Sequence, residues 1–310
     1  MSEYETIIVG GGPAGLSAAI HLAWHNRKVL VIDRKSGPLF FALERLYNVP
    51  GMPAIRGIDL QKQLKAQAED LGAVVLRGNV ISAQGKEGAF KLKGENGETW
   101  EAKTLLLATG VARYHPTVDG DFRPCFAYAG KGNMFYCPDC EAPLITDKDT
   151  VVIGVGPADW AAAMAVGLSR YTDKLRVLLT KDTEISAHRS DQLKAKGIGL
   201  IVGTIKELKG KKGILTGLSL EDGTELSAEA FFVSSPARGR TDLAQQLGVD
   251  MAPTSNHAQP KSQRGDTNVP GVWIAGDLRP MTQQVPVAMG TGNIAAVMID
   301  QYLRNEEVVP

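Results

Sequence analysis

The beginning of the chain holds the pattern that most limits how it can fold. Residues 5–37 read ETIIVGGGPAGLSAAIHLAWHNRKVLVIDRKSG: an apolar run, a glycine turn, an apolar stretch with the period of a helix, and a second apolar run. This order predicts a strand, a turn, a helix and another strand, which together make a βαβ unit. Because such a unit builds a parallel sheet covered by helices, we expect an α/β fold.

The turn of this unit has the spacing of a dinucleotide-binding loop. Gly10, Gly12 and Gly15 fit the pattern G-x-G-x-x-G, and Asp33 ends the second strand. The first glycine permits the tight turn, the second lets the backbone approach a pyrophosphate, and the third lets helix pack on strand. The helix N-terminus then faces the phosphates, and an acidic residue such as Asp33 accepts hydrogen bonds from a ribose. The first unit therefore predicts a dinucleotide site.

A second copy of the pattern begins in the middle of the chain. Residues 149–182 read DTVVIGVGPADWAAAMAVGLSRYTDKLRVLLTKD, with Gly154 and Gly156 in the first two glycine places. Asp159 stands in the third place, where a carboxylate is bulkier than glycine and negative where a pyrophosphate would lie. We expect this copy to keep its fold as a scaffold while its nucleotide site is degenerate.

The length and the order of these elements predict two interleaved domains. A chain of 310 residues is long for one compact core and suits two. We expect two Rossmann-like, three-layer β/β/α dinucleotide-binding domains, the second inserted into the first. The expected boundaries are 1–114 for the first part of the first domain, 115–243 for the inserted domain, and 244–310 for the second part of the first domain.

Charge and hydropathy exclude several classes of partner. Lys and Arg number 34 and Asp and Glu also number 34, so nothing indicates a surface for nucleic acid. No apolar run approaches the roughly 20 residues that span a bilayer, so no membrane association is expected. The N-terminus enters a strand directly and has no signal-peptide pattern, so we expect a cytoplasmic protein.

The segment GNMFYCPDCE, residues 132–141, places Cys137 and Cys140 two residues apart. From spacing alone the pair fits a zinc half-site, a structural staple or a redox disulfide. In a reducing compartment a close pair is more often catalytic or metal-binding than structural. The third cysteine, Cys125, has no evident partner and is expected to be a half-buried thiol.

Several motifs in this order resemble the low-molecular-weight thioredoxin reductase family over essentially the whole chain. They are GGGPAG with Asp33, YNVPGMP, LLLATG and GVWIAGDL. The resemblance implies bound FAD. It also implies a set of flavin-binding residues: Gly10, Gly12, Gly15, Asp33, Asn48, Gly110, Asp277, Gln284 and Val285.

The cysteine pair lies where this family has C-A-T-C-D, which implies a redox-active disulfide. Zinc would need two further ligands, and the remaining cysteine is isolated while the five histidines are scattered, so no metal is expected. By the family pattern Cys140 faces the flavin and Cys137 attacks the disulfide of a partner. Glu141 stands where the family has its acidic proton donor, and Asp139 inside the motif is a competing candidate.

The sequence departs from the family where NADPH would bind. The family's inserted domain has G-x-G-x-x-A and later H-R-R-x-x-F-R, whose arginines hold the 2′-phosphate. Here the second stretch reads LLTKDTEISAHR, which keeps at most Lys181 as a cation, with Asp182 or Thr183 where another arginine belongs. His188 and Arg189 come several residues later. Together with Asp159, this departure predicts that NADPH is not used.

The chain therefore resembles the pyridine-nucleotide-independent members of the family, which are linked to ferredoxin or have a second flavin. The resemblance implies an FAD-dependent disulfide oxidoreductase, a homodimer, that reduces a thioredoxin-like protein with electrons from ferredoxin or another low-potential donor. A second flavin could stack in or near the degenerate site on aromatic residues, namely Tyr128, Phe135, Tyr136 and Trp160. Two alternatives remain: a dithiol oxidase that passes electrons from a small dithiol to oxygen, and a non-catalytic redox sensor.

Overall fold

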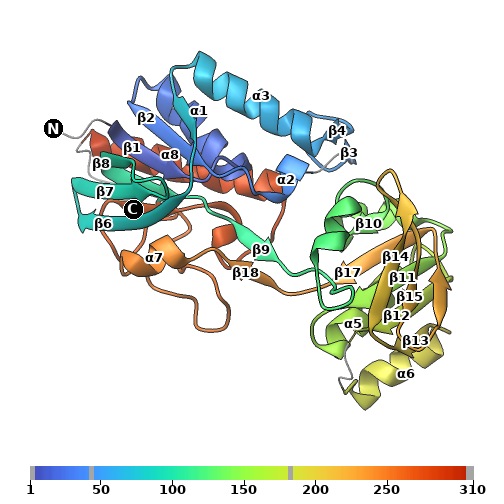
Figure 1. The fold of residues 1–310 in the computed structure, drawn as a ribbon. Coiled ribbons are helices and arrows are strands. Elements are labelled where there is room, and N and C mark those ends of the chain that lie inside the picture. Colours follow the sequence, from blue (N-terminus) through green and yellow to red (C-terminus); the bar gives the residue numbers. More distant parts are fainter. Residues whose placement is uncertain (1–3, 42–44, 181–183, 305–310) are drawn as a thin grey trace. The chain divides into compact units, whose positions relative to one another are not determined.

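The computed structural model describes residues 4–41, 45–180 and 184–304. The chain divides into two compact units, and each is described by itself (Figure 1). The first unit contains residues 1–40, 49–112 and 238–310, and the second contains residues 41–48 and 113–237. Both are built from parallel strands and helices, so the predicted α/β fold with one Rossmann-like unit inserted into another is confirmed.

The first unit is built on a seven-stranded sheet. β1 pairs in parallel with β2 and β8, β2 pairs in parallel with β5, and β19 pairs in parallel with β8. β6, β7 and β8 form an antiparallel extension. In spatial order the strands are β5 (Val74–Arg77), β2 (Val29–Asp33), β1 (Tyr4–Val9), β8 (Thr99–Leu107), β7 (Ala89–Gly94) and β6 (Val80–Lys86), with β19 (Val272–Ile274) beside β8.

Three helices of the first unit pack together: α1 (Pro13–Trp24), α3 (Gly57–Asp70) and α8 (Val285–Leu303). Small residues let α1 and α8 approach closely, because a Cβ added at Gly292 would collide with the carbonyl of Ala14. The Ser17 hydroxyl also donates a hydrogen bond to the Met289 carbonyl at 2.9 Å. The shorter elements of this unit are α2 (Pro38–Phe41), β4 (Ile55–Arg56), α7 (Asp242–Gln246) and the 3-10 turn η3 (Gly276–Leu278).

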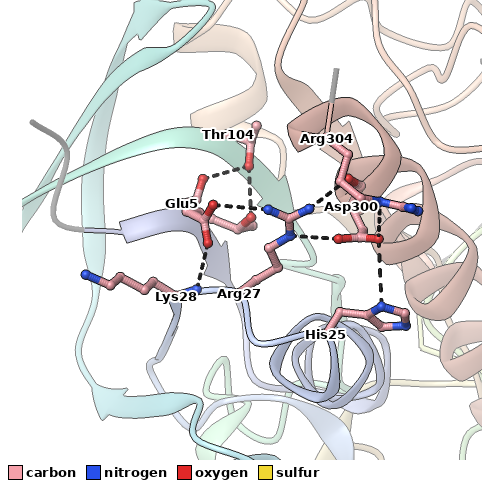
Figure 2. Close-up of polar contacts among 8 residues, drawn as sticks. Glu5, His25, Arg27, Lys28, Thr104, Asp300 and Arg304 are labelled. Atoms are coloured by element: carbon pink, nitrogen blue, oxygen red, sulfur yellow. Dashed lines mark hydrogen bonds and ion pairs between the residues drawn. The ribbon is translucent and has the colours of Figure 1, made fainter. Parts of the chain in front are cut away.

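An ionic network ties the C-terminal end of α8 to the end of α1 and to β1 (Figure 2). The Asp300 carboxylate, which is buried, accepts a hydrogen bond from Arg27 Nε at 2.7 Å and lies 3.1 Å from Arg304 Nε. The other side of the Arg27 guanidinium donates to Glu5 at 3.3 Å. Burial alone would raise the pKa of Asp300, but its hydrogen bond and charge pairing with Arg27 outweigh burial and hold that pKa below its ordinary value.

The second unit has three layers. Its parallel sheet has the order β10 (Met134–Phe135), β17 (Ala230–Ser234), β11 (Thr150–Gly154), β12 (Leu175–Leu179) and β13 (Gly199–Val202). The antiparallel layer contains β14 (Ile205–Lys211), β15 (Ile214–Leu220) and β16 (Glu225–Ser227), and the helical layer contains α5 (Ala158–Leu168) and α6 (Ala187–Ala195).

Alternation along β11 explains these layers. Val151 and Ile153 share a core with Leu215 and Leu218 of the antiparallel sheet, whereas Val152 belongs to the core that includes the alanines of α5. Successive side chains of a strand point to opposite faces, so a fully apolar strand requires cover on both sides. The apolar run predicted at 150–154 is therefore buried as expected.

The remaining elements lie around the cysteine motif and at the links of the chain. They are β3 (Arg45–Leu46), β9 (Val111–Arg113), η1 (Arg123–Ala127), α4 (Pro138–Glu141), η2 (Ala142–Ile145) and β18 (Ala237–Gly239). The chain passes from the first unit to the second within β9 and returns at β18. No helix in the described ranges combines the length and the apolar character that crossing a bilayer requires.

Candidate active site

The carboxyl ends of four parallel strands gather the predicted flavin residues of the first unit. Because β2, β1, β8 and β19 run in the same direction, the segments that follow them meet at one edge of the sheet. This edge brings together five of the predicted residues: Gly10, Gly12, Asp33, Gly110 and Asp277.

The glycines of the first turn divide into two physical roles. Gly10 has a φ of +107°, and a Cβ there would collide with the carbonyl of Ala108. A Cβ at Gly15 would collide with the carbonyl of Gly10, so helix and strand touch at this point. A Cβ at Gly12, the N-cap of α1, would meet nothing within 4 Å. The turn thus leaves an open cradle at the start of a helix, which fits the pyrophosphate of a dinucleotide.

Asp33 lies directly beside this turn, since a Cβ at Gly11 would be 2.8 Å from the Asp33 Cβ. Arg240, which the sequence analysis missed, also belongs here. Its two terminal nitrogens donate to the hydroxyl and the carbonyl of Ser36 at 3.2 Å each, and its amide donates to the Gly110 carbonyl at 2.9 Å. Burial and the nearby Arg34 lower the pKa of Arg240, while Asp33 opposes them. Arg240 is far along the chain from the glycine turn, so no motif around that turn could identify it.

The C-terminal part of the predicted site follows β19. Gly276 has a φ of +66°, its amide donates to the Thr291 hydroxyl at 3.0 Å, and Asp277 comes next in η3. Gln284 is the N-cap of α8 and Val285 its first residue. Asn48 is exposed and lies in segment 41–48, which groups with the second unit and not with this sheet edge.

Cys137 and Cys140 form a disulfide in the second unit, with 5.3 Å between their Cα atoms. Cys137 is the N-cap of the short helix α4, and its carbonyl accepts the amides of Cys140 at 3.1 Å and Glu141 at 3.0 Å. Both cysteines are partly exposed. The pair therefore lies at a helix start, where a thiolate is stabilised by backbone amides.

The two acidic candidates differ in their surroundings. One Glu141 carboxylate oxygen accepts hydrogen bonds from the backbone amides of Tyr136 and Cys137, both at 2.9 Å. Glu141 thus reaches back to the N-cap amide, as the acidic residue of a capping box does. Asp139 is exposed on the first turn of α4. Glu141 therefore fixes the backbone of Tyr136 and Cys137, a contact that the sequence did not predict.

The second glycine turn has less free space than the first. A Cβ at Gly156 would lie 3.1 Å from the Pro236 ring and 3.6 Å from Trp160, so side chains lie beside the place where a pyrophosphate would approach. Asp159 Oδ1 accepts the amide of Ser186, the N-cap of α6, at 2.8 Å. This backbone hydrogen bond lowers the pKa of Asp159. The positions where the sequence lacks the arginine pair lie outside the described residues; they are Lys181, Asp182 and Thr183.

The aromatic residues proposed for a second flavin pack mainly in cores. Phe135 and Tyr128 are buried, and burial raises the pKa of Tyr136 well above its ordinary value. Trp160 alone among the four is largely exposed, at 53 %. Cys125 is fully buried, not half-buried as predicted, because it lies in the core between the two sheets. Burial raises the pKa of its thiol to about 12.

Metal ligands do not gather in the described part of the chain. No group of three or more His, Cys, Asp and Glu side chains there has an arrangement that could hold a metal ion.

Comparison with known proteins places these features in a family. A family model described as pyridine nucleotide-disulphide oxidoreductase matches residues 4–292. A thioredoxin reductase of Peptoclostridium litorale is 30% identical over 318 residues, with 97% of each chain covered. A solved thioredoxin reductase from Giardia duodenalis is 29% identical with a TM-score of 0.81, covering 97% of this chain and 99% of that one.

An atypical thioredoxin reductase from Desulfovibrio vulgaris Hildenborough is also 29% identical, with a TM-score of 0.51, and covers 99% of this chain and 100% of that chain. These likenesses make the protein an oxidoreductase that acts on a sulfur group, in a family for which FAD is the expected cofactor. With its open glycine turn, its inserted unit and its C-x-x-C disulfide, the chain belongs to the pyridine nucleotide-disulphide oxidoreductase family, as a flavoprotein like the low-molecular-weight thioredoxin reductases.

Proposed function

We propose that this protein is an FAD-dependent enzyme that reduces the disulfide of a thioredoxin-like protein through Cys137 and Cys140, with electrons from ferredoxin or another low-potential donor and not from NADPH. The observation that carries this proposal is the contrast between the two glycine turns. Gly12 faces open space at the first turn, whereas Pro236 and Trp160 lie within contact distance of a Cβ at Gly156 at the second.

The residues at the edge of the first sheet would hold FAD. The Gly10–Gly15 turn would receive the pyrophosphate, Asp33 the ribose, and Arg240 would place a cation beside them. Asp277 would accept a hydrogen bond from a ribityl hydroxyl, and the backbone at Gln284 and Val285 would meet the pyrimidine edge. Gly110 and Asn48 complete the proposed set. When bound, FAD supplies a centre that accepts electrons singly or in pairs.

The two cysteines would carry out the exchange with the partner protein. The Cys137 thiolate attacks one sulfur of the partner's disulfide, a mixed disulfide forms, and the partner's other sulfur leaves as a thiolate. The Cys140 thiolate then attacks the Cys137 sulfur, which restores the Cys137–Cys140 bond and releases the partner's second thiolate. Two electrons pass to the partner, and two protons convert its thiolates to thiols.

The surroundings of the acids suggest how this exchange is supported. Glu141 would hold the backbone of the attacking residue through the amides of Tyr136 and Cys137. Asp139 is exposed on the turn between the cysteines and would supply a proton to a departing thiolate. We therefore propose Asp139 as the acid and Glu141 as a positioning residue.

The second glycine turn supports the proposal that the electron donor is not NADPH. The carboxylate of Asp159 holds the amide of Ser186, and its negative charge lies in the first turn of α5, where a nucleotide phosphate would otherwise approach. The Pro236 ring, 3.1 Å from a Cβ built at Gly156, narrows the space at the same turn. A homodimer is part of the proposal, and a second flavin near Trp160 is an alternative to the enzyme with one FAD in each chain.

The direction of electron flow tests the proposed function. The flavin-loaded protein is mixed anaerobically with reduced ferredoxin and an oxidised thioredoxin, and new thiols on thioredoxin are counted. We expect catalytic thiol formation. Peroxide production from a small dithiol and oxygen, without thioredoxin reduction, would instead show a dithiol oxidase. Absence of turnover with every donor and acceptor would favour a redox sensor.

Flavin binding has its own prediction at the open turn. Gly12→Ala is expected to leave the fold intact, because a Cβ at this position meets nothing within 4 Å. It should nevertheless raise the Kd for FAD by about tenfold or more, since it fills the space through which the pyrophosphate approaches the backbone. Equilibrium titration of the apoprotein with FAD measures this change.

Gly167→Ala in α5 is the matched control, because a Cβ there also meets nothing within 4 Å. Its Kd for FAD should equal that of the unmodified protein, and its helix should gain about 1 kcal/mol in propensity. If the Gly12→Ala and Gly167→Ala variants bind FAD with equal affinity, the pyrophosphate does not bind at the first turn.

A further inference from the structure

Two phenylalanines of the second unit are exposed next to one another. Phe122 and Phe126 are 48 % and 49 % exposed, and their ring centroids lie 5.7 Å apart at an interplanar angle of 78°. Phe122 is the N-cap of the 3-10 turn η1 and Phe126 lies within that turn, which precedes the cysteine motif along the chain. Exposed aromatic pairs of this kind are enriched at protein–protein interfaces, where large rings act as anchors.

A chain of ring contacts joins this pair to the redox disulfide. The His115 ring packs edge-on against Phe126 and Tyr136, with centroid distances of 5.2 Å in each case. His115 Nδ1 and the Tyr136 hydroxyl share a hydrogen bond at 2.7 Å. Tyr136 immediately precedes Cys137, and Glu141 holds the amides of both. The exposed rings are thus fixed to the segment that carries the attacking cysteine.

One lysine contacts the aromatic pair, and two more belong to a hairpin that packs on that lysine. The Lys131 ammonium donates to the Phe126 carbonyl at 2.6 Å. The turn of the β14–β15 hairpin, which contains Lys211 and Lys212, packs on Lys131, because a Cβ at Gly213 would be 3.1 Å from the Lys131 Cβ. The Asn133 side chain fixes the hairpin by exchanging two hydrogen bonds with the backbone of Leu215, at 2.7 and 2.8 Å.

These lysines differ in their pairing from Lys209 of the same hairpin. Lys209 forms an ion pair with Glu225 at 2.7 Å. Within the described ranges, no carboxylate forms an ion pair with Lys131, Lys211 or Lys212. A cluster of uncompensated cations at the rim of exposed rings is complementary to a partner with an apolar centre and a carboxylate rim.

We propose that Phe122, Phe126, Lys131, Lys211 and Lys212, the aromatic–lysine surface, dock the protein whose disulfide is reduced, and that this partner presents an apolar patch rimmed by carboxylates beside its disulfide. The proposal rests on the proposed function. Disulfide exchange requires sulfur-to-sulfur contact, so the partner must cover surface that is continuous with Cys137. The ring contacts through His115 and Tyr136 provide that continuity.

Direct binding tests the aromatic–lysine surface without requiring turnover. An oxidised thioredoxin with an acidic rim around its disulfide is titrated into the flavin-loaded protein, and the Kd is measured by calorimetry. The double variant Phe122→Ser/Phe126→Ser should weaken binding by about tenfold or more, as anchor residues do. Lys131→Glu/Lys212→Glu should weaken it similarly and reverse its dependence on salt, because the cluster becomes negative and salt then screens a repulsion.

Matched controls lie on the first unit. Trp24→Ser removes an aromatic side chain that is 70 % exposed on α1, and Lys62→Glu reverses an exposed charge on α3. Both should leave the Kd unchanged. The docking proposal is overturned if either control weakens binding as much as the surface variants do. It is also overturned if thioredoxin binds equally well to all variants, or if the unmodified protein binds no thioredoxin.

Turnover separates this proposal from the proposed function. With reduced methyl viologen as the electron source, the surface variants should raise KM for thioredoxin by about tenfold. Their rate with the small disulfide dithiobis(nitrobenzoate) should stay unchanged, because a small molecule needs no docking surface. The unmodified protein could bind thioredoxin through this surface and yet reduce no disulfide. That result would support the docking site and refute the proposed function.

Discussion

Replacing Cys140 with serine is expected to lower the rate of disulfide reduction by about a thousand-fold or more, because the variant has no thiol that can pass electrons between flavin and partner. Cys137→Ser should lose turnover to the same extent for a different reason. It keeps a Cys140 thiol that perturbs the flavin absorbance, but it lacks the sulfur that attacks the partner's disulfide. Steady-state turnover and the flavin absorbance spectrum of both variants measure these effects.

Cys125→Ser is the matched control for this pair. The Cys125 thiol is fully buried, donates to the Pro116 carbonyl at 3.2 Å, and has a pKa raised to about 12, so it supplies no thiolate at neutral pH. Serine can keep that hydrogen bond, and turnover should remain near that of the unmodified protein. Full activity in Cys137→Ser and Cys140→Ser would show that the disulfide takes no part in the reaction.

NADPH and NADH are both expected to leave the flavin oxidised in anaerobic mixing experiments, whereas reduced ferredoxin should bleach it. For NADPH the expected loss comes from two missing charge-assisted contacts to the 2′-phosphate, at roughly 1.5 to 3 kcal/mol each, which together weaken affinity by about two to four orders of magnitude. NADH has no 2′-phosphate, and its expected failure rests on the Asp159 charge and the Pro236 ring beside Gly156, which also add to the loss for NADPH.

Asp159→Ala serves to separate these contributions. The variant removes the negative charge, but Pro236 is still present and the arginine pair is still missing. Its flavin should therefore still resist reduction by NADPH. Reduced methyl viologen should bleach both proteins and shows that their flavins are competent. Rapid bleaching of the unmodified protein by stoichiometric NADPH would contradict the account and would mean that Lys181, His188 or Arg189 rebuilds the phosphate site.

Local patterns in the sequence were sufficient to predict the fold class. Each βαβ unit has its strand, turn and helix signals within about three dozen residues, and parallel pairing follows from the crossover helix. Gly10 and Gly15 illustrate the same point, since the motif predicts the close backbone approaches that the structure shows. The spacing of Cys137 and Cys140 left a zinc half-site open, and the resemblance to the family implied the disulfide that the structure shows.

Features that depend on distant residues could not be read from the sequence. Pro236 approaches Gly156 from a strand end far along the chain, and Arg240 reaches Ser36 and Gly110 only after the chain returns to the first unit. Glu141 was one of two candidate proton donors, with Asp139, from its place in the motif. Its hydrogen bonds to the amides of Tyr136 and Cys137 depend on how the short helix α4 begins, which no local pattern specified.

The central claim is that one FAD and one redox-active disulfide operate together in each chain. Anaerobic reductive titration with dithionite, followed by flavin absorbance, counts the electrons that each chain accepts. The account predicts about four electrons per FAD for the unmodified protein, two for the Cys137–Cys140 bond and two for the flavin, and about two for the Cys137→Ser/Cys140→Ser variant. Uptake of only about two electrons per FAD by the unmodified protein would contradict it.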